Sequence, residues 1–88
     1  MDIAKLPNLG LKSKQMLAIA GIHSFEQLSK LGAVRAYLQV KRSGVKVSLN
    51  LLWAMEGALS NRHWLEVART DRLNLLLELE REQSAPAT

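Results

Sequence analysis

The spacing of apolar residues predicts a chain of short helices, separated by glycine and serine residues. A first helix is expected over residues 12–20 and ends at Gly21, a residue that readily takes the left-handed conformation found after helices. Ser24 and Gln27 stand at capping-box spacing and begin a second helix, which stops at Gly32. Short helices separated by such turn residues are typical of a compact helical domain.

Two further helices carry most of the apolar residues. One is expected over residues 33–42, where the apolar side chains fall on one side. The next follows Ser48 as its cap and covers residues 49–59, with apolar residues at almost every position. A helix that is apolar on all sides is buried, so this segment is expected to form the core around which the others pack. Gly57 inside it indicates a close helix crossing.

The last third of the chain is less regular. Residues 61–68 are interpreted as a turn with a short helix, and Thr70 caps a last helix over residues 71–82. Residues 83–88 have no periodicity and are expected to be a disordered tail. No segment alternates with period two. The fold expected is therefore all-α: one domain over residues 1–82, built as a small orthogonal bundle of about five helices.

Composition narrows the class of protein. With 88 residues and 48% hydrophobic residues, the chain is one domain with a packed core. It has no cysteine, which excludes disulfides and thiolate metal sites and fits a reducing cytosol. The longest apolar run, residues 16–22, is far shorter than the roughly 20 residues of a membrane-spanning helix. We therefore expect a cytoplasmic protein without a membrane partner.

Charge is unevenly distributed along the sequence. Residues 1–46 hold eight Lys and Arg residues against two acids, a net charge of +6. Residues 47–88 hold four Arg residues against six acids, a net charge of −2. This asymmetry predicts a basic face formed by the N-terminal half, which suits nucleic acid. The alternative is an ordinary solvated surface, since scattered lysines are common.

The motif that carries most information is Leu6-Pro7-Asn8-Leu9-Gly10-Leu11-Lys12-Ser13-Lys14. It resembles the helix-hairpin-helix of sequence-independent DNA-binding proteins. It is also similar to the N-L-G-x-x-S turn that the α subunit of RNA polymerase has in its C-terminal domain. A turn of this kind leaves backbone N–H groups free at a helix N-terminus, where a phosphate can bind. Asn8 stands where such hairpins usually have glycine. The alternative is that the hairpin only packs.

The candidate nucleic-acid contacts follow from this motif and from the basic residues around it. They are Asn8, Leu9, Gly10, Leu11, Lys12 and Lys14 of the motif, together with Lys5, Lys41 and Lys46. The backbone of the turn is expected to bind one phosphate and the lysines to neutralise others. No helix displays a set of Arg, Asn and Gln residues suited to reading bases, so no DNA sequence is predicted.

Several segments together carry a wider resemblance. They are Leu6-Pro7-Asn8-Leu9-Gly10, Ala20-Gly21-Ile22, Leu31-Gly32-Ala33-Val34, Ser48 to Leu59, His63-Trp64 and Leu75-Leu76. With this spacing, residues 6–80 resemble the C-terminal domain of the TfoX/Sxy regulators of bacterial natural competence. The resemblance implies a helical bundle that helps to switch on DNA-uptake genes, alongside a transcription activator. In that family the domain usually follows a separate N-terminal domain.

Catalytic chemistry has little support in the sequence. The two histidines, His23 and His63, have no Cys or His partner at ligand spacing, so no metal site is expected. Glu56 lies in the apolar helix and is expected to pair with Arg62 or Arg69 rather than to act as an acid. The aromatic residues are assigned to the core. We expect no enzyme activity, no cofactor and no small-molecule substrate.

The last helix has more leucines than one face can hold. Leu73, Leu75, Leu76, Leu77 and Leu79 occupy more than one face, and Leu75 with Leu79 is the pair expected to contact another chain. Two functions therefore remain open. One is a nucleic-acid-associated regulator of transcription or competence genes. The other is a protein-interaction or dimerisation module that docks on another regulator or on itself without contacting DNA.

Overall fold

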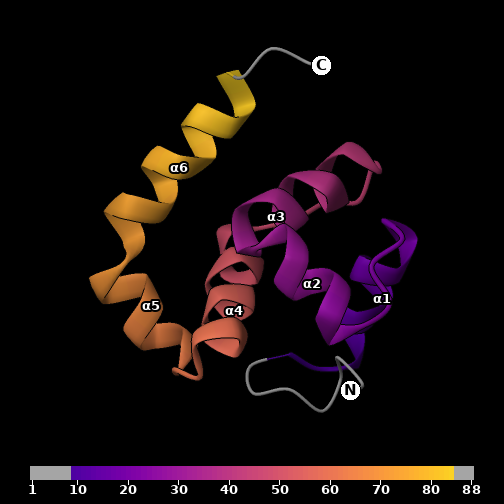
Figure 1. Ribbon diagram of the computed structural model, residues 1–88, viewed down its shortest axis with the longest axis horizontal. Helices are drawn as coiled ribbons and strands as arrows, with labels where there is room; N and C mark the ends of the chain where they lie inside the picture. Colours follow the sequence, from indigo (N-terminus) through magenta and orange to yellow (C-terminus); the bar gives the residue numbers. More distant parts are fainter. Residues whose placement is uncertain (1–8, 85–88) are drawn as a thin grey trace.

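The computed structural model of the protein describes residues 9–84. In this range the chain is all-α, as predicted from its periodicity, and forms six helices without a strand. They are α1 (Leu11–Ile19), α2 (Phe25–Leu31), α3 (Ala33–Arg42), α4 (Leu49–Ser60), α5 (Trp64–Thr70) and α6 (Arg72–Ser84). Figure 1 shows α1 to α4 on one side and α5 with α6 as an arm along the other.

The prediction of about five helices did not count α5 as a separate helix. It begins after His63, whose side-chain Nδ1 accepts a hydrogen bond from the Leu65 N–H at 3.1 Å. Histidine is not among the residues that usually cap helices, so the sequence offered only a weak start signal. The interpretation of residues 61–68 as a turn with a short helix was close, but the helix runs on to Thr70.

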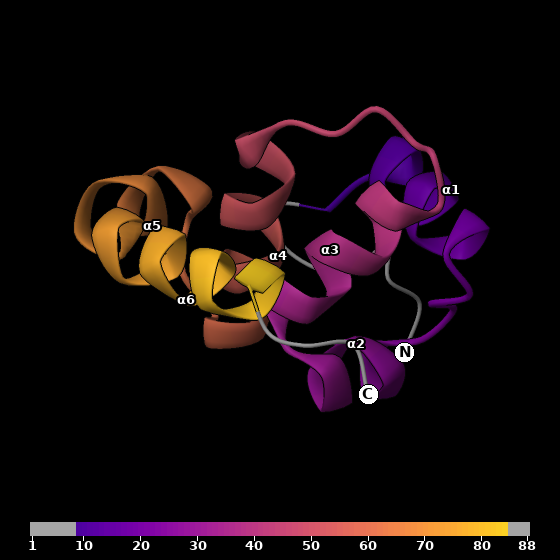
Figure 2. The same ribbon diagram turned by 90° about the horizontal axis from the view of Figure 1, so that it is seen from above.

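The centre of the fold is α3 rather than the more apolar α4. Helix α3 contacts α1, α2, α4 and α6, whereas the most extensive neighbour of α4 is α5. Small buried residues, Ala33 and Ala36, let neighbouring helices approach α3 closely. Figure 2 shows α3 between α1, α2 and α4. The prediction that α4 is buried holds for half of its twelve positions; Asn50 and Ser60 are exposed, and the other four, Glu56 among them, are half-buried.

One tight turn ends α1 and begins the connection to α2. Helix α1 ends in a Schellman motif: the Gly21 N–H donates to the Ala18 carbonyl, and the Ile22 N–H donates to the Leu17 carbonyl. Gly21 has φ 84°, as this motif requires, and Ile22 packs beside Leu17, with both buried. Gln39 of α3 also holds the turn, because its side-chain amide donates to the Ala20 carbonyl at 2.6 Å.

The predicted capping box of α2 is present in a shifted form. The Ser24 hydroxyl accepts from the Gln27 N–H at 3.2 Å, as in a standard N-cap. The Gln27 side chain accepts from the N–H of His23, one residue before the usual donor. Both of these N–H groups at the start of the helix are satisfied in this way.

Gly32 joins α2 to α3 in a conformation available to glycine alone. Its φ of 80° and ψ of 161° lie in a region that other residues avoid, at a cost of about 1–3 kcal/mol. We expect Gly32→Ala to lower the free energy of unfolding by about that amount. An added Cβ at Gly32 would meet no atom within 4 Å, so the whole loss would come from the backbone. Urea unfolding followed by circular dichroism measures it.

The control for this prediction is Gly10→Ala. Gly10 also has open space around its Cβ position, but its φ is −113°, which any residue adopts. The control should lose clearly less stability than Gly32→Ala. Equal losses in the two variants would show that backbone strain at Gly32 is not the cause.

An ion pair holds α5 and α6 against the end of α4. Asn61, in the left-handed conformation, ends α4. The next residue, Arg62, forms a two-pronged contact with Asp71, in which Nη1 donates to Oδ1 at 3.1 Å and Nη2 donates to Oδ2. The Arg62 guanidinium and the Thr70 hydroxyl lower the pKa of the Asp71 carboxyl. This ion pair therefore favours the folded state above the ordinary carboxyl range and loses its effect as the pH falls.

Helix α6 packs against α3 through the leucine face that was predicted to contact another chain. Leu75 and Leu79 are each 8% exposed and belong to the core, so the prediction that they form an exposed interface is wrong. A helix with leucines on several faces buries the face that meets its neighbour, and that neighbour is α3. The leucines left exposed are Leu73 and Leu77, at 69% and 49%. Outside the core, α6 is joined to α3 by an ion pair between Arg35 and Glu82 at 3.5 Å.

The domain boundary also shifts slightly. Helix α6 continues through Ser84, two residues beyond its predicted end, so residues 83 and 84 are helical rather than part of a tail. Residues 85–88, the remainder of the predicted tail, lie outside the described residues.

Candidate functional site

Only part of the predicted turn motif lies within the described residues. Lys5 and Asn8 lie outside the described residues, as does any helix before the turn, so the helix-hairpin-helix stays a prediction. Leu9 is 4% exposed and belongs to the core, so its side chain does not reach a ligand. Gly10 is the N-cap of α1, and Leu11, the first residue of that helix, is exposed.

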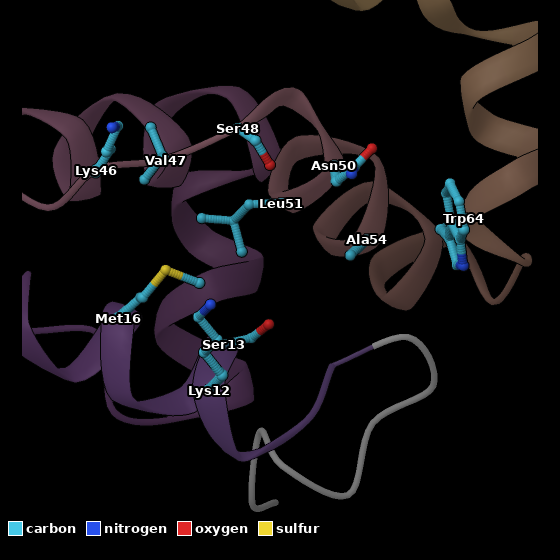
Figure 3. Close-up of a pocket in the computed structure, with 10 residues that line it drawn as sticks. All are labelled: Lys12, Ser13, Met16, Lys46, Val47, Ser48, Asn50, Leu51, Ala54 and Trp64. Carbon is cyan, nitrogen blue, oxygen red and sulfur yellow. The ribbon is translucent and has the colours of Figure 1, made fainter.

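Two of the predicted lysines, far apart in the sequence, line one groove. Lys12 lies in the first turn of α1, and Lys46 lies in the segment between α3 and α4. The groove between them has a volume of about 530 Å³ and is open to solvent on one side. Figure 3 shows Lys12 on the α1 side and Lys46 across from it. The fold thus brings together two members of the predicted set.

Two of the three helices that border the groove, α1 and α4, present their N-terminal ends without neutralising groups, whereas α5 has a His63 cap and Glu66 in its first turn. The N-cap of α1 is Gly10 and that of α4 is Ser48, and neither makes a side-chain capping hydrogen bond. Neither helix has an acidic residue in its first turn. The N-terminal end of a helix carries a partial positive charge from its unpaired N–H groups. These ends add to the positive charge of Lys12 and Lys46, and among residues 9–84 no acid lines the groove.

The floor of the groove is apolar, which the sequence did not indicate. It is formed by five side chains from four segments: Met16, Val47, Leu51, Ala54 and Trp64. Polar groups complete the lining: Ser13, Ser48 and Asn50. In Figure 3, Leu51 lies near the middle and Trp64 at one end.

Trp64 was assigned to the core and is only half-buried. Its indole stacks on the His63 ring, with ring centroids 5.8 Å apart and an angle of 29° between the planes. It reaches the groove because α5 begins at Trp64. Since the start signal of α5 is weak, the sequence pattern could not place this tryptophan beside α1 and α4.

Two other predicted lysines, Lys14 and Lys41, do not line the groove. Lys14 is half-buried on another side of α1, because a residue two positions along a helix points in a different direction from Lys12. Lys41 is exposed in the last turn of α3. Neither lines the groove, although both belong to the basic half of the molecule.

Glu56 of α4 is a half-buried carboxylate with an unfavourable environment. Burial raises its pKa, the charge of Arg62 opposes the shift, and Asp71 and Glu78 add to it. Arg62 forms its hydrogen-bonded ion pair with Asp71, so what the structure shows of the predicted pairing of Glu56 with Arg62 is charge attraction only. The net effect is to disfavour the ionised form of Glu56 in the folded protein.

We expect Glu56→Gln to be at least as stable as the wild type at neutral pH. When folding raises the pKa of a carboxyl group, that group stabilises the folded protein fully only at pH values below its unfolded pKa. This stabilisation is lost as the pH rises through the folded pKa. Glutamine removes this loss, so the advantage of the variant should shrink as the pH falls through the carboxyl range. Thermal unfolding from pH 3 to 8, with the exposed Glu80→Gln as control, measures it. A variant less stable than the wild type at pH 7 would mean that the attraction to Arg62 outweighs burial.

Within residues 9–84, no three His, Asp or Glu side chains are grouped in a way that suits a metal ion. Among the helices of the same range, none combines the length and the apolar composition needed to cross a membrane.

The sequence has relatives among proteins with names that refer to DNA transformation. It is 31% identical over 74 residues to the DNA transformation protein TfoX of Haemophilus influenzae, a match that covers 84% of this chain and 34% of that protein. It is 35% identical over 60 residues to the DNA transformation protein TfoX1 of Aliivibrio fischeri, covering 67% of this chain and 29% of that protein. The chain thus spans about a third of the length of these relatives.

Two solved structures from Listeria monocytogenes have the same fold. One, an uncharacterized protein in a triclinic crystal, superposes with a TM-score of 0.80 at 24% identity, and all of both chains is covered. The other, a protein of unknown function in a tetragonal crystal, gives a TM-score of 0.76 at 26% identity and covers 90% of this chain and 96% of that chain. The family model of the TfoX C-terminal domain matches residues 1–79. With nearly the whole sequence matched, the chain belongs to the TfoX C-terminal domain family.

Proposed function

We propose that this domain is a non-enzymatic regulatory module that binds the phosphate backbone of double-stranded DNA through the basic groove. The observation that carries the proposal is the convergence of Lys12 and Lys46 on one groove, where the described lining residues include no acid. Two helix N-termini border the same groove without side-chain caps. Lysine side chains and helix N-termini are both frequent phosphate ligands in protein–DNA complexes.

The proposed binding does not depend on base sequence. Reading bases in the major groove requires side chains such as Arg, Asn or Gln placed to bond base edges. The groove offers one such side chain, Asn50. Its two lysines act as point charges that suit phosphate oxygens. We therefore expect DNA affinity that varies little with sequence and strongly with salt.

The biological role we propose is a part in the regulation of competence, the uptake of DNA. The relatives in Haemophilus influenzae and Aliivibrio fischeri are named DNA transformation proteins, and this chain matches about a third of each. A domain that holds DNA without reading its sequence would act there together with a partner that selects the promoter, such as a transcription activator.

The experiment is a fluorescence-anisotropy titration of a labelled duplex with the protein at several salt concentrations. If Lys12 and Lys46 are joined by two further cations of the basic half, about four phosphates are neutralised, and the log–log slope should be about −3.6. A second duplex of unrelated sequence should bind with similar affinity. Absence of binding at the lowest salt concentration would refute the proposal.

A second candidate function is docking on another regulator, and the apolar floor of the groove favours it. Five apolar side chains line the groove, and contact with phosphates alone would leave them exposed to water. An acidic amphipathic helix of another protein would bury this floor and place its carboxylates beside Lys12 and Lys46. Failure of the DNA titration would leave this function as the better explanation of the groove.

A further inference from the structure

We infer that the domain binds a second copy of itself, with the outer face of α6 of one copy seated in the basic groove of the other. The outer face of α6 is formed by Leu73, Asn74 and Leu77, with Glu80 and Arg81 in the turn that follows. Leu73 and Leu77 are 69% and 49% exposed, one turn apart on the helix. Large apolar side chains exposed in a row on one helix mark a contact surface.

The groove and the outer face of α6 match in chemistry. Helix-in-groove contacts use apolar anchors spaced three or four residues apart, placed in an apolar channel. Leu73 and Leu77 have that spacing, and the groove floor is apolar from Met16 to Trp64. The volume of about 530 Å³ accommodates a few large side chains rather than a whole helix, so α6 would lie across the opening with its leucines inserted.

Charge favours a second copy over other occupants. Residues 9–48 carry seven Lys and Arg residues against one acid, a net charge of +6. Residues 64–84, which include α5 and α6, carry three Arg residues against five acids, a net charge of −2. Glu80 is exposed on the outer face of α6 and would meet the lysines of the groove, whereas Glu78 is turned toward α3 of its own copy. The outer face of α6 is therefore an apolar ridge within a region of net negative charge, and the groove is apolar within a region of net positive charge.

A single copy does not place these two surfaces together. Helix α6 packs on α3 through Leu75 and Leu79, so its outer face points away from the rest of the molecule. The groove lies between α1, the segment before α4, α4 and the start of α5. The contact is therefore made between two copies and joins unlike surfaces. Where the proposed function holds, DNA and α6 compete for Lys12 and Lys46, and self-association would regulate access to DNA.

Sedimentation at increasing protein concentration tests the inference. The wild type should associate beyond its 9.8 kDa monomer mass at low salt, and less so at high salt. Leu77→Arg should remain monomeric and folded, because the residue is exposed and the new charge faces the lysines of the partner groove. The matched control is Ser29→Arg, which adds the same charge at an exposed position of α2 and should associate like the wild type. A wild type that stays monomeric up to about 1 mM overturns the inference.

A mixing experiment identifies the surfaces. Lys46→Glu damages the groove and keeps α6 intact, whereas Leu77→Arg damages α6 and keeps the groove. Each variant alone should be monomeric, and a mixture of the two should associate, because the intact groove of one meets the intact α6 of the other. A mixture that stays monomeric while the wild type associates overturns the assignment of surfaces. Leu77→Arg should also keep the DNA affinity of the wild type or exceed it, so this inference can fail independently of the proposed function.

Discussion

Leu52→Ala should destabilise the domain by about 2–5 kcal/mol, the range measured for removing a buried leucine side chain. Leu52 of α4 has no exposed surface, and neither has Met55 one turn further along the helix. The substitution removes apolar contacts and leaves a cavity that the surrounding helices fill only in part. In a domain of 88 residues this loss is a large part of the total stability, so the variant should be partly unfolded at 37 °C.

The matched control is Leu73→Ala, the same substitution on the exposed side of α6. Leu73 is 69% exposed, so its truncation should change the free energy of unfolding by less than about 0.5 kcal/mol. Urea unfolding of both variants at pH 7 gives the comparison. Similar losses at the two positions would contradict the burial pattern and the packing of α4 in the core.

Lys12→Glu combined with Lys46→Glu should weaken DNA binding at least about tenfold at 0.1 M salt and make the log–log salt slope shallower by about 1.8. The two lysines are the cations that line the groove, and each phosphate contact contributes about 0.9 to the slope. Both residues are exposed and neither belongs to the core, so the variant should keep its helical spectrum and unfolding midpoint.

The control for this pair is Lys30→Glu combined with Arg69→Glu. It changes the net charge of the protein by the same amount, at exposed positions of α2 and α5 that do not line the groove. It should keep the wild-type slope and lose little affinity. An equal loss in both double variants would mean that net charge alone, rather than the groove, attracts the DNA.

The helices could be predicted where their signals are local. The Schellman turn at Gly21, the cap at Ser24 and the break at Gly32 depend on single residues with distinct backbone or side-chain properties, and the structure has all three. The short helix expected within residues 61–68 could not be given exact bounds, because the cap of α5 is His63, an unusual choice. The central position of α3 was not predicted. It depends on which helices pack against one another, and no local sequence pattern determines this.

The site could be predicted only in part. The sequence indicated that Lys12 and Lys46 are basic residues of one half, but their meeting in one groove depends on how α1, α3 and α4 pack. The choice of Leu75 and Leu79 as an interface was wrong because a leucine-rich helix shows several apolar faces. Only its packing on α3 decides which face is left for a partner, and that face holds Leu73 and Leu77.

The most direct test of the proposed DNA contact is a two-dimensional NMR titration of the ¹⁵N-labelled protein with a short duplex at low salt. The proposal predicts that the largest shifts of backbone N–H signals occur at the border of the groove: the first turn of α1, Lys46 and the first turn of α4. The titration uses the Leu77→Arg variant, which should stay monomeric, so that release of α6 from a second copy adds no shifts; signals from the middle of α2 and from α6 should then change little. In that variant, shifts concentrated on α6, or no shifts at millimolar duplex, would contradict the assignment of the groove as a DNA-binding surface.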